Sequence, residues 1–248
     1  MIAPLTAARF ADNLAGIAHG FFGRGSALDN PNDIPGATAN RRAAADSLMP
    51  AAPIAINHQV HGIMCRIIDA TPDPDARPHA DALATRLPGV MLAIHTADCA
   101  PVLLADTRAG VVGAAHAGWR GALDGVTDST IAAMEALGAD RGHIAAAIGP
   151  CIARASYEVD AGFFARFCEA DGDNARFFID GKSGHYHFDL ESYVAHRLAS
   201  AGIRTIALLG IDTATSTDYW SHRRGTLSGI AEKGRQISMI GIAGAVSP

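Results

Sequence analysis

The sequence predicts a mixed α/β fold of one domain, in which helices pack on the outside of β-sheets. Short apolar runs bounded by turn residues recur along the chain, as expected for strands. Stretches with helical apolar periodicity lie between them, which favours helices packed against those sheets. No repeat, linker or low-complexity segment divides the chain, so we expect a single domain over residues 1–248.

The composition is that of a globular protein with a large core. Hydrophobic residues make up 49% of the 248 residues and charged residues only 18%. A net charge of −5 and the lack of a Lys/Arg block argue against a nucleic-acid partner. No apolar run approaches the roughly 20 residues of a membrane span, and we expect no signal peptide. The four cysteines show no Cys-x-x-Cys spacing, so we expect reduced thiols and a cytoplasmic protein.

The expected elements follow from local patterns. Apolar runs predict strands at 18–22, 53–56, 64–68, 89–94, 102–105, 111–115, 144–148, 175–179, 186–188, 206–209 and 237–242. Helices are expected at 40–45, 119–137, 161–170 and 190–201. Asn40 is the expected N-cap of the first helix, and Gly138 is expected to end the second. Residues 28–37, rich in Asn, Pro, Asp and Gly, are expected to form a loop.

The stretch from His95 to Arg120 is the part around which we expect the rest to be organised. The runs 102–105 and 111–115 flank a polar turn and predict a buried hairpin. Cys99 precedes the first run and His116 follows the second. Antiparallel pairing returns both ends to one sheet edge, which predicts that this thiol and this imidazole are neighbours.

Three residues at the ends of strand-like runs are candidate metal ligands and candidate catalytic residues: His61, Cys99 and His116. His58 and His61 would face opposite sides of an extended chain, so we expect only one of them in the site. Two imidazoles and a thiolate suit Zn²⁺, and three protein ligands leave one position open, as in catalytic sites. His95 and Asp98 could orient a ligand imidazole, although Asp98 could equally cap a turn.

Arginines recur in loops and at element ends, where a guanidinium could bind phosphate or carboxylate. Arg120 and Arg223 are among them, and Tyr219 and Trp220 could add a stacking surface. The candidate substrate-binding residues are Arg24, Asn40, Arg41 and Arg224.

Several motifs occur in an order that resembles one family. They are His58-Gln59-Val60-His61-Gly62, Thr96-Ala97-Asp98-Cys99-Ala100-Pro101, Ala114-Ala115-His116-Ala117-Gly118-Trp119-Arg120-Gly121 and Gly149-Pro150-Cys151-Ile152. Together they resemble the laccase-domain (polyphenol-oxidase-like) family of purine nucleoside phosphorylases. The resemblance implies a single laccase-domain-type catalytic domain of α/β/β/α layers, related to the catalytic domain of cytotoxic necrotising factor toxins. The family's zinc ligands correspond to His61, Cys99 and His116.

The resemblance also implies an activity. A zinc-dependent phosphorylase would act on adenosine, inosine or methylthioadenosine with phosphate, and would also deaminate adenosine. Three alternatives remain open: a hydrolase that edits a cell-wall precursor with Cys99 and His116, a copper-dependent polyphenol oxidase, and a non-catalytic protein whose metal is structural. The oxidase would need several copper ions, whereas the histidines near the proposed site suit one mononuclear centre. Zinc is therefore the expected metal and copper the alternative, while the sequence leaves the oligomeric state open.

The chain departs from the family pattern in two places. Asp212-Thr213 stands where many relatives have Cys-Thr, and Gly25-Ser26 replaces a Gly-Gly pair after Arg24. Both departures lie outside the three expected ligands, so we expect them to affect substrate preference more than metal binding.

Overall fold

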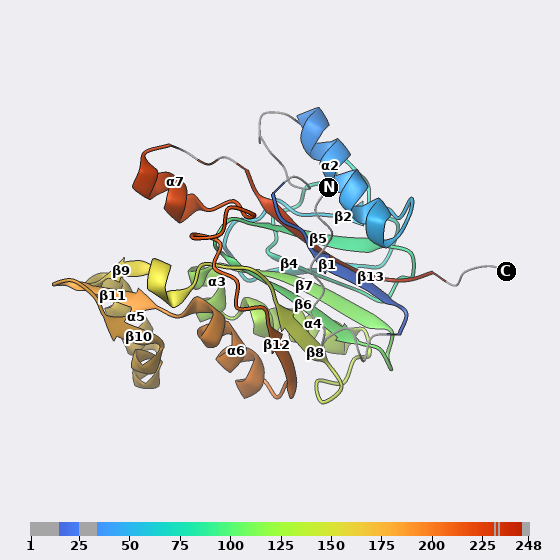
Figure 1. The fold of residues 1–248 in the computed structure, drawn as a ribbon. Helices are drawn as coiled ribbons and strands as arrows, with labels where there is room; N and C mark the ends of the chain where they lie inside the picture. Colours follow the sequence, from blue (N-terminus) through green and yellow to red (C-terminus); the bar gives the residue numbers. More distant parts are fainter. Residues whose placement is uncertain (1–14, 25–33, 231, 233, 245–248) are drawn as a thin grey trace.

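Two β-sheets stacked face to face form the centre of the computed structural model, which describes residues 15–24, 34–230, 232 and 234–244 (Figure 1). The first sheet has the order β1 (Ile17–Phe21), β13 (Gln236–Ile242), β5 (Met91–Thr96), β2 (Ile54–Ala55). The second has the order β12 (Thr205–Leu208), β8 (Ala145–Ile148), β6 (Ala100–Asp106), β7 (Val111–Ala117), β4 (Ala82–Thr85), β3 (Cys65–Ile68). Both sheets are mixed, since β2–β5, β3–β4 and β8–β12 pair in parallel and the other pairs are antiparallel.

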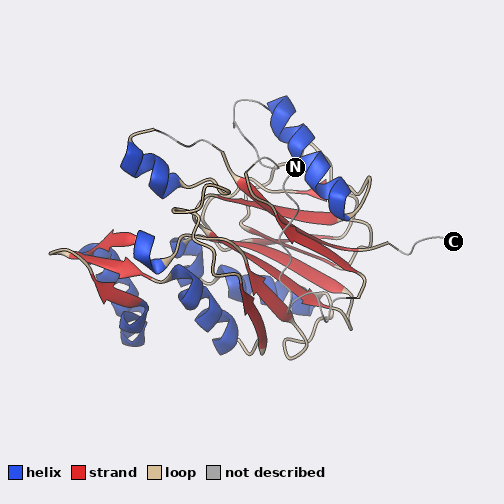
Figure 2. Cartoon of the chain, in the orientation of Figure 1, coloured by secondary structure: helices blue, strands red, loops and turns tan. Residues whose placement is uncertain are grey.

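Helices cover the outer faces of these sheets (Figure 2). The first sheet is covered by α2 (Ile34–Leu48), and the second by α3 (Trp119–Asp124), α4 (Val126–Ala136) and α6 (Leu190–Ser200). A small third sheet, β10 (Phe178–Asp180), β11 (His185–Phe188), β9 (Glu158–Asp160), packs with α5 (Ala161–Ala170) to one side. The remaining elements are α7 (His222–Ser228) and two 3₁₀ helices, Arg154–Ser156 and Gly172–Phe177. The predicted mixed α/β architecture with outer helices is therefore confirmed.

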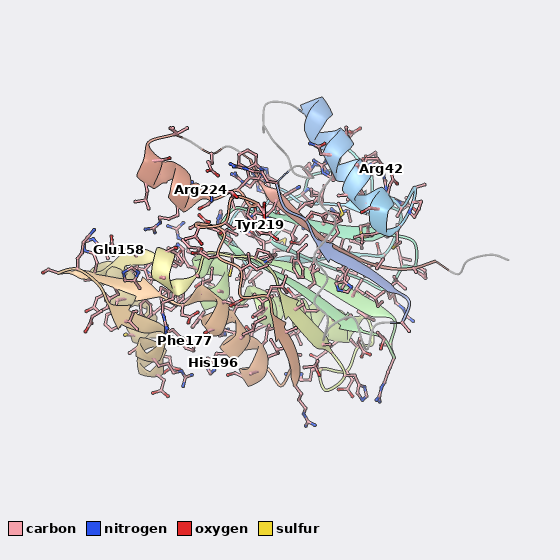
Figure 3. All side chains as sticks on the ribbon, viewed as in Figure 1. Arg42, Glu158, Phe177, His196, Tyr219 and Arg224 are labelled. Carbon is pink, nitrogen blue, oxygen red and sulfur yellow. The ribbon has the colours of Figure 1, made fainter. Side chains whose placement is uncertain are left out.

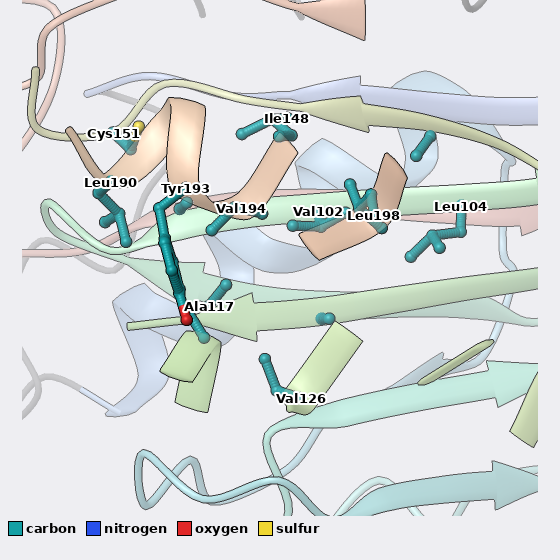
Figure 4. Packing of buried hydrophobic residues seen from close by; sticks show 14 of the residues in the cluster. Val102, Leu104, Ala117, Val126, Ile148, Cys151, Leu190, Tyr193, Val194 and Leu198 are labelled. Carbon is teal, nitrogen blue, oxygen red and sulfur yellow. The ribbon is translucent and has the colours of Figure 1, made fainter. Parts of the chain in front are cut away.

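Apolar side chains fill three successive layers, and β6 shows how one strand serves two of them. Val102 and Leu104 face the helices, where they pack with Val194 and Leu198 of α6 (Figure 4). Leu103 faces the other way, into the cluster between the two sheets. Side chains alternate across a strand, so a strand buried on both faces reads as a continuous apolar run. A third cluster lies between the first sheet and α2.

The predicted hairpin is confirmed, whereas two helix predictions need correction. Residues 119–137 form two helices, because Gly125 adopts a left-handed conformation (φ 105°) that ends α3 and begins α4. Helix α2 begins at Ile34, so residues 34–37 are helical rather than loop. Asn40 consequently lies inside this helix and is not its N-cap. Helix α5 has the predicted bounds, and Gly138 follows α4 with φ 101°.

Some elements differ from the expected pattern for physical reasons. The predicted strand at 175–179 starts as a 3₁₀ helix and becomes β10 only at Phe178. Strand β4 escaped prediction because its sequence, Ala-Leu-Ala-Thr, is poor in β-branched residues although all four are buried. Strand β9 and helix α7 were also not predicted. No helix in the described ranges is long and apolar enough to cross a membrane.

Gly149 supplies a test of the packing between the sheets. A Cβ atom there would overlap the ring of Phe21, which is 1% exposed in the inter-sheet cluster. We expect Gly149→Ala to lower the free energy of unfolding by about 1–3 kcal/mol, as overpacked core sites do. Gly172→Ala is the control, because a Cβ atom at Gly172 meets nothing within 4 Å. Equal stability of the two variants in denaturant titrations would contradict this account of the packing.

Candidate metal centre and active-site cleft

A cleft of about 630 Å³ opens where several strands of the two central sheets end. It collects residues that are far apart in the sequence, from the loop after β2, the end of β5, the β6–β7 hairpin and the start of α7. Its lining includes Asn57, His58, Gln59, His61, His95, Asp98, Cys99, His116, Trp119, Arg120, Tyr157, His222, Arg223 and Arg235.

The β6–β7 hairpin brings Cys99 and His116 together, as predicted. Pro101 pairs with His116 and Ala100 with Ala117, so Cys99 comes opposite Gly118 at the open end of the hairpin. Gly118 is required there, since a Cβ atom would lie 3.1 Å from the Cys99 sulfur and 2.9 Å from the His61 ring. The pairing register and one glycine thus make room for the three side chains.

His61 reaches the same place from a loop that is held by a buried carboxylate. Asp81 accepts hydrogen bonds from the backbone amides of Val60, His61 and Gly62, at 3.1, 2.9 and 2.7 Å. These bonds hold His61 in a left-handed conformation (φ 61°), which is uncommon for a residue with a side chain. The same carboxylate lies 2.8 Å from His116 Nδ1, which must carry the proton and donate it. One aspartate therefore positions two of the three predicted ligands.

A second contact ties this loop to β5. The Gln59 side-chain amide donates to the His95 carbonyl at 2.7 Å, and its oxygen accepts from the His95 amide at 2.8 Å. His58 does not join the three-residue group; its ring stacks on His79 with 4.8 Å between the ring centres, at the edge of the same cleft. Only His61 of the two histidines therefore approaches Cys99, as expected.

The pKa values of Cys99 and His116 are shifted in opposite directions, so that the thiol loses its proton easily and the imidazole keeps its own. Burial alone would raise the pKa of the Cys99 thiol, but the charge and hydrogen bonds of His116 and His61 lower it to about 6. Burial would lower the pKa of His116, whereas the Cys99 thiolate and the Asp81 carboxylate raise it to about 9. The hydrogen bonds from His116, Gly62 and Val60 outweigh burial and lower the pKa of Asp81. The site thus favours a thiolate, the form of cysteine that binds metals and attacks electrophiles.

The three side chains fit a zinc ion by chemistry and by spacing. Their ligand atoms all lie within 4.8 Å of one another, and the Cys99 sulfur is 3.9 Å from His61 Nε2. Zn–S and Zn–N bonds of about 2.3 and 2.1 Å at a tetrahedral angle put such atoms roughly 3.6 Å apart, so a bound ion would draw these side chains slightly closer together. Because His116 Nδ1 is bound to Asp81, Nε2 is the nitrogen left for a metal.

Asp98 has a different role from the one considered for it. Its carboxylate accepts from the Thr213 hydroxyl and from the Arg223 amide, both at 2.7 Å, rather than orienting an imidazole. Asp212, the residue before Thr213, accepts hydrogen bonds from the Ser156 hydroxyl at 2.6 Å and from the Ala153 amide at 3.1 Å. The Asp212-Thr213 departure therefore joins three segments around the cleft, while Gly25-Ser26 lies outside the described residues.

The candidate arginines fall into two groups. Arg24 and Arg224 both pair with Glu232, at 3.1 and 2.6 Å. Arg224 also donates to the carbonyls of Thr213, Ala214, Ser216 and Tyr219 (Figure 3), so its N–H donors are taken up by the protein. We assign Arg224 to holding this segment together and leave it out of the proposed anion site. Asn40 and Arg41 lie on α2, the helix that covers the first sheet.

Several residues of the site, among them Asp81, Gln59 and Arg235, escaped the sequence analysis. Asp81 precedes β4, which was itself not predicted, so nothing marked it as the end of an element. Gln59 was noted only as part of a motif, and Arg235 looked like an ordinary residue before a strand. An acidic residue directly before the apolar run 82–84 was the signal available for Asp81.

Comparisons with known proteins identify the family. A family model described as multi-copper polyphenol oxidoreductase laccase matches residues 10–243. A purine nucleoside phosphorylase of Rickettsia conorii is 39% identical over 173 residues, covering 69% of this chain and 70% of the relative. The purine nucleoside phosphorylase of Deinococcus radiodurans is 36% identical and covers 94% of this chain and 88% of its own length.

Solved structures show the same fold. The Neisseria meningitidis protein NMB0706, described as DUF152, superposes with a TM-score of 0.78 at 28% identity, covering 93% of this chain and 96% of that one. Bacillus licheniformis YfiH gives a TM-score of 0.79 at 26% identity, covering 91% and 92% of the two chains. Since the family model spans nearly the whole sequence, this chain belongs to the multi-copper polyphenol oxidoreductase laccase family.

Proposed function

We propose that the protein is a zinc-dependent purine nucleoside phosphorylase, which is a transferase. We propose that it also deaminates adenosine, which is a hydrolase reaction. The observation that carries this proposal is the His61–Cys99–His116 group in a cleft large enough for a small ligand. Relatives of substantial identity that are named purine nucleoside phosphorylases support the substrate class. We treat residues 1–248 as one catalytic domain, and the Cys99 thiolate suits a reducing compartment such as the cytoplasm.

The walls of the cleft suit a purine nucleoside. Trp119 and Tyr157 line it and offer aromatic faces on which a base could stack. Burial raises the pKa of the Tyr157 phenol, so the hydroxyl stays protonated and can donate a hydrogen bond to a purine nitrogen. Arg120 lies over the Trp119 ring and Arg223 over the Tyr157 ring, and Arg235 adds positive charge elsewhere in the cleft.

In the proposed phosphorolysis, a phosphate oxygen attacks C1′ of the ribose and the bond from C1′ to the purine nitrogen breaks. The bonding electrons leave with the base, which takes up a proton, and ribose 1-phosphate is released. In deamination, water replaces the amino group of adenosine and ammonia leaves. Zinc held by His61, Cys99 and His116 would supply Lewis acidity and water activation. The protein residues hold the base, restrict water and neutralise phosphate charge.

A cysteine hydrolase is the second candidate, and one observation favours it. Asp81 Oδ1 lies 2.8 Å from His116 Nδ1, so Asp81, His116 and Cys99 have the order of an acid, base and nucleophile. A polyphenol oxidase fits less well. Within the described part of the chain, one three-residue His/Cys group is found, whereas multi-copper chemistry needs ligands for several ions.

Metal content and Cys99→Ser together separate these candidates. We expect about one zinc per chain in protein purified without added metal, because the donor set suits zinc. Cys99→Ser should lose both zinc and activity, because a serine hydroxyl is a poor ligand at neutral pH. A folded Cys99→Ser protein that keeps its zinc but is inactive would identify Cys99 as a nucleophile instead. Several coppers per chain would overturn the zinc assignment.

Asp81→Asn tests how the ligands are positioned. The variant keeps the size of the side chain but places an amino group among backbone N–H donors, so the loop of His61 should shift. We expect zinc affinity to fall by roughly tenfold to a hundredfold, the usual effect of losing such a partner. Zinc affinity would be measured by competition with a chelator.

Asp106→Asn is the matched control for Asp81→Asn. Asp106 is also buried and accepts from the amides of Arg108, Ala109 and Asp140, at 3.0, 3.1 and 2.9 Å, but it lies at the turn of the β6–β7 hairpin. It should lose stability while keeping wild-type zinc affinity. Equal zinc affinity in both variants would show that Asp81 does not position the ligands.

The dual activity predicts competition between phosphate and water for the same bound adenosine. Raising the phosphate concentration should shift the products from inosine towards adenine and ribose 1-phosphate, in proportion to phosphate below saturation. Product ratios can be followed by chromatography, with sulfate at equal ionic strength as the control. A ratio that does not change with phosphate would refute a shared site for the two reactions.

A further inference from the structure

His95 presents an imidazole towards α2 at the edge of the cleft. In the pairing of β5 with β13, His95 lies opposite Ile237, and Ile237 packs with Met91 and Ala93 in the cluster beneath α2. Side chains two apart on a strand share a face, so His95 lies on this α2 side too. Its Nε2 atom is buried and has no hydrogen-bond partner among the described residues.

Three arginines from different segments lie near enough to this imidazole for their charges to lower its pKa. Arg41 lies three and four residues before Ala44 and Ala45, which pack into the cluster beneath α2, so it shares their helix face. Arg235 comes directly before β13 and lines the cleft with His95. Burial, then the charges of Arg41, Arg235 and Arg77, hold the pKa of His95 well below its ordinary value. The imidazole is therefore neutral beside three cations.

Neither Arg41 nor Arg235 forms an ion pair within the described ranges, whereas the charge of Asp75 partly offsets that of Arg77. The ion pairs of the nearby arginines go elsewhere: Arg24 and Arg224 to Glu232, and Arg42 to Asp46. Burial and the charge of Arg77 lower the pKa of Arg41 to about 10, and its Nε is buried without a partner in the described chain. Guanidinium groups gathered in this way repel one another, and an anion would reverse that repulsion.

We propose that Arg41, Arg235 and His95 form a phosphate subsite on the α2 side of the cleft, with Arg77 adding charge. Guanidinium groups bind phosphate through paired N–H donors, and a neutral imidazole can add one more donor at Nε2. The assignment to phosphate deepens the proposed phosphorolysis and rests on it. The bound group is either inorganic phosphate or the phosphate ester of a nucleotide, since both present the same oxygens.

Direct binding tests the subsite without turnover. Calorimetry would titrate inorganic phosphate into the full-length, zinc-loaded protein and into Arg235→Gln and Arg41→Lys. Arg235 is exposed, so its replacement should leave the fold unchanged. We expect Arg235→Gln to weaken phosphate binding roughly tenfold to a hundredfold, and Arg41→Lys to weaken it less because the charge remains.

Arg86→Gln is the charge-matched control. Arg86 is exposed and directly follows β4, whereas Asp81 directly precedes that strand. The whole length of β4 therefore separates Arg86 from the Asp81 end, where the cleft lies. Arg86→Gln should bind phosphate as the wild type does. Phosphate binding that is unchanged in Arg235→Gln and Arg41→Lys, or weakened equally by Arg86→Gln, would overturn the proposal.

Adenosine 5′-monophosphate distinguishes the source of the phosphate. If this nucleotide binds more tightly than inorganic phosphate and depends on the same arginines, the subsite holds an ester phosphate. If inorganic phosphate binds as well and adds to adenosine binding, the subsite holds the free anion. Failure of both ligands to bind the wild type overturns the subsite. Arginine-dependent binding without any phosphorolysis would instead refute the proposed function and leave the subsite intact.

Discussion

The candidate site depends on the buried carboxylate of Asp81 more than on any other single group. It accepts three hydrogen bonds from backbone amides in the loop of His61 and one hydrogen bond from His116. A buried carboxylate is costly unless its lone pairs are filled, and here four donors fill them. Since the loop follows β2 of one sheet and His116 ends β7 of the other, Asp81 also links the two sheets where they open into the cleft.

The stacked sheets explain why the site lies at their ends. Between the sheets, apolar side chains such as Leu92 and Leu103 exclude water and leave no room for polar groups. At the strand ends the backbone separates, and residues with left-handed backbone conformations, His61 and Asp98, occur there. Such conformations are uncommon outside glycine, and they persist where surrounding contacts hold them. Asp81 supplies those contacts for His61, and Thr213 and Arg223 supply them for Asp98.

Local sequence patterns were enough to predict the part of the site that lies on one hairpin. Cys99 and His116 belong to one hairpin, so apolar runs and a turn were enough to bring them together. His61 depends on Asp81, 20 residues away, through bonds between a side chain and backbone amides that no local periodicity records. The break at Gly125 was missed for a similar reason. The apolar stripe continues across it, and only the backbone conformation separates the two helices.

The arginines show most clearly where sequence reasoning stops. Arg24, Arg41 and Arg224 looked alike, because all three occur in polar segments beside the expected site. Their roles differ through one partner, Glu232, which neutralises Arg24 and Arg224. Arg41 and Arg235 form no ion pair within the described residues, and they lie on the side where His95 is kept neutral. The position of Glu232 thus decides which arginines hold the structure together and which remain free to bind an anionic ligand.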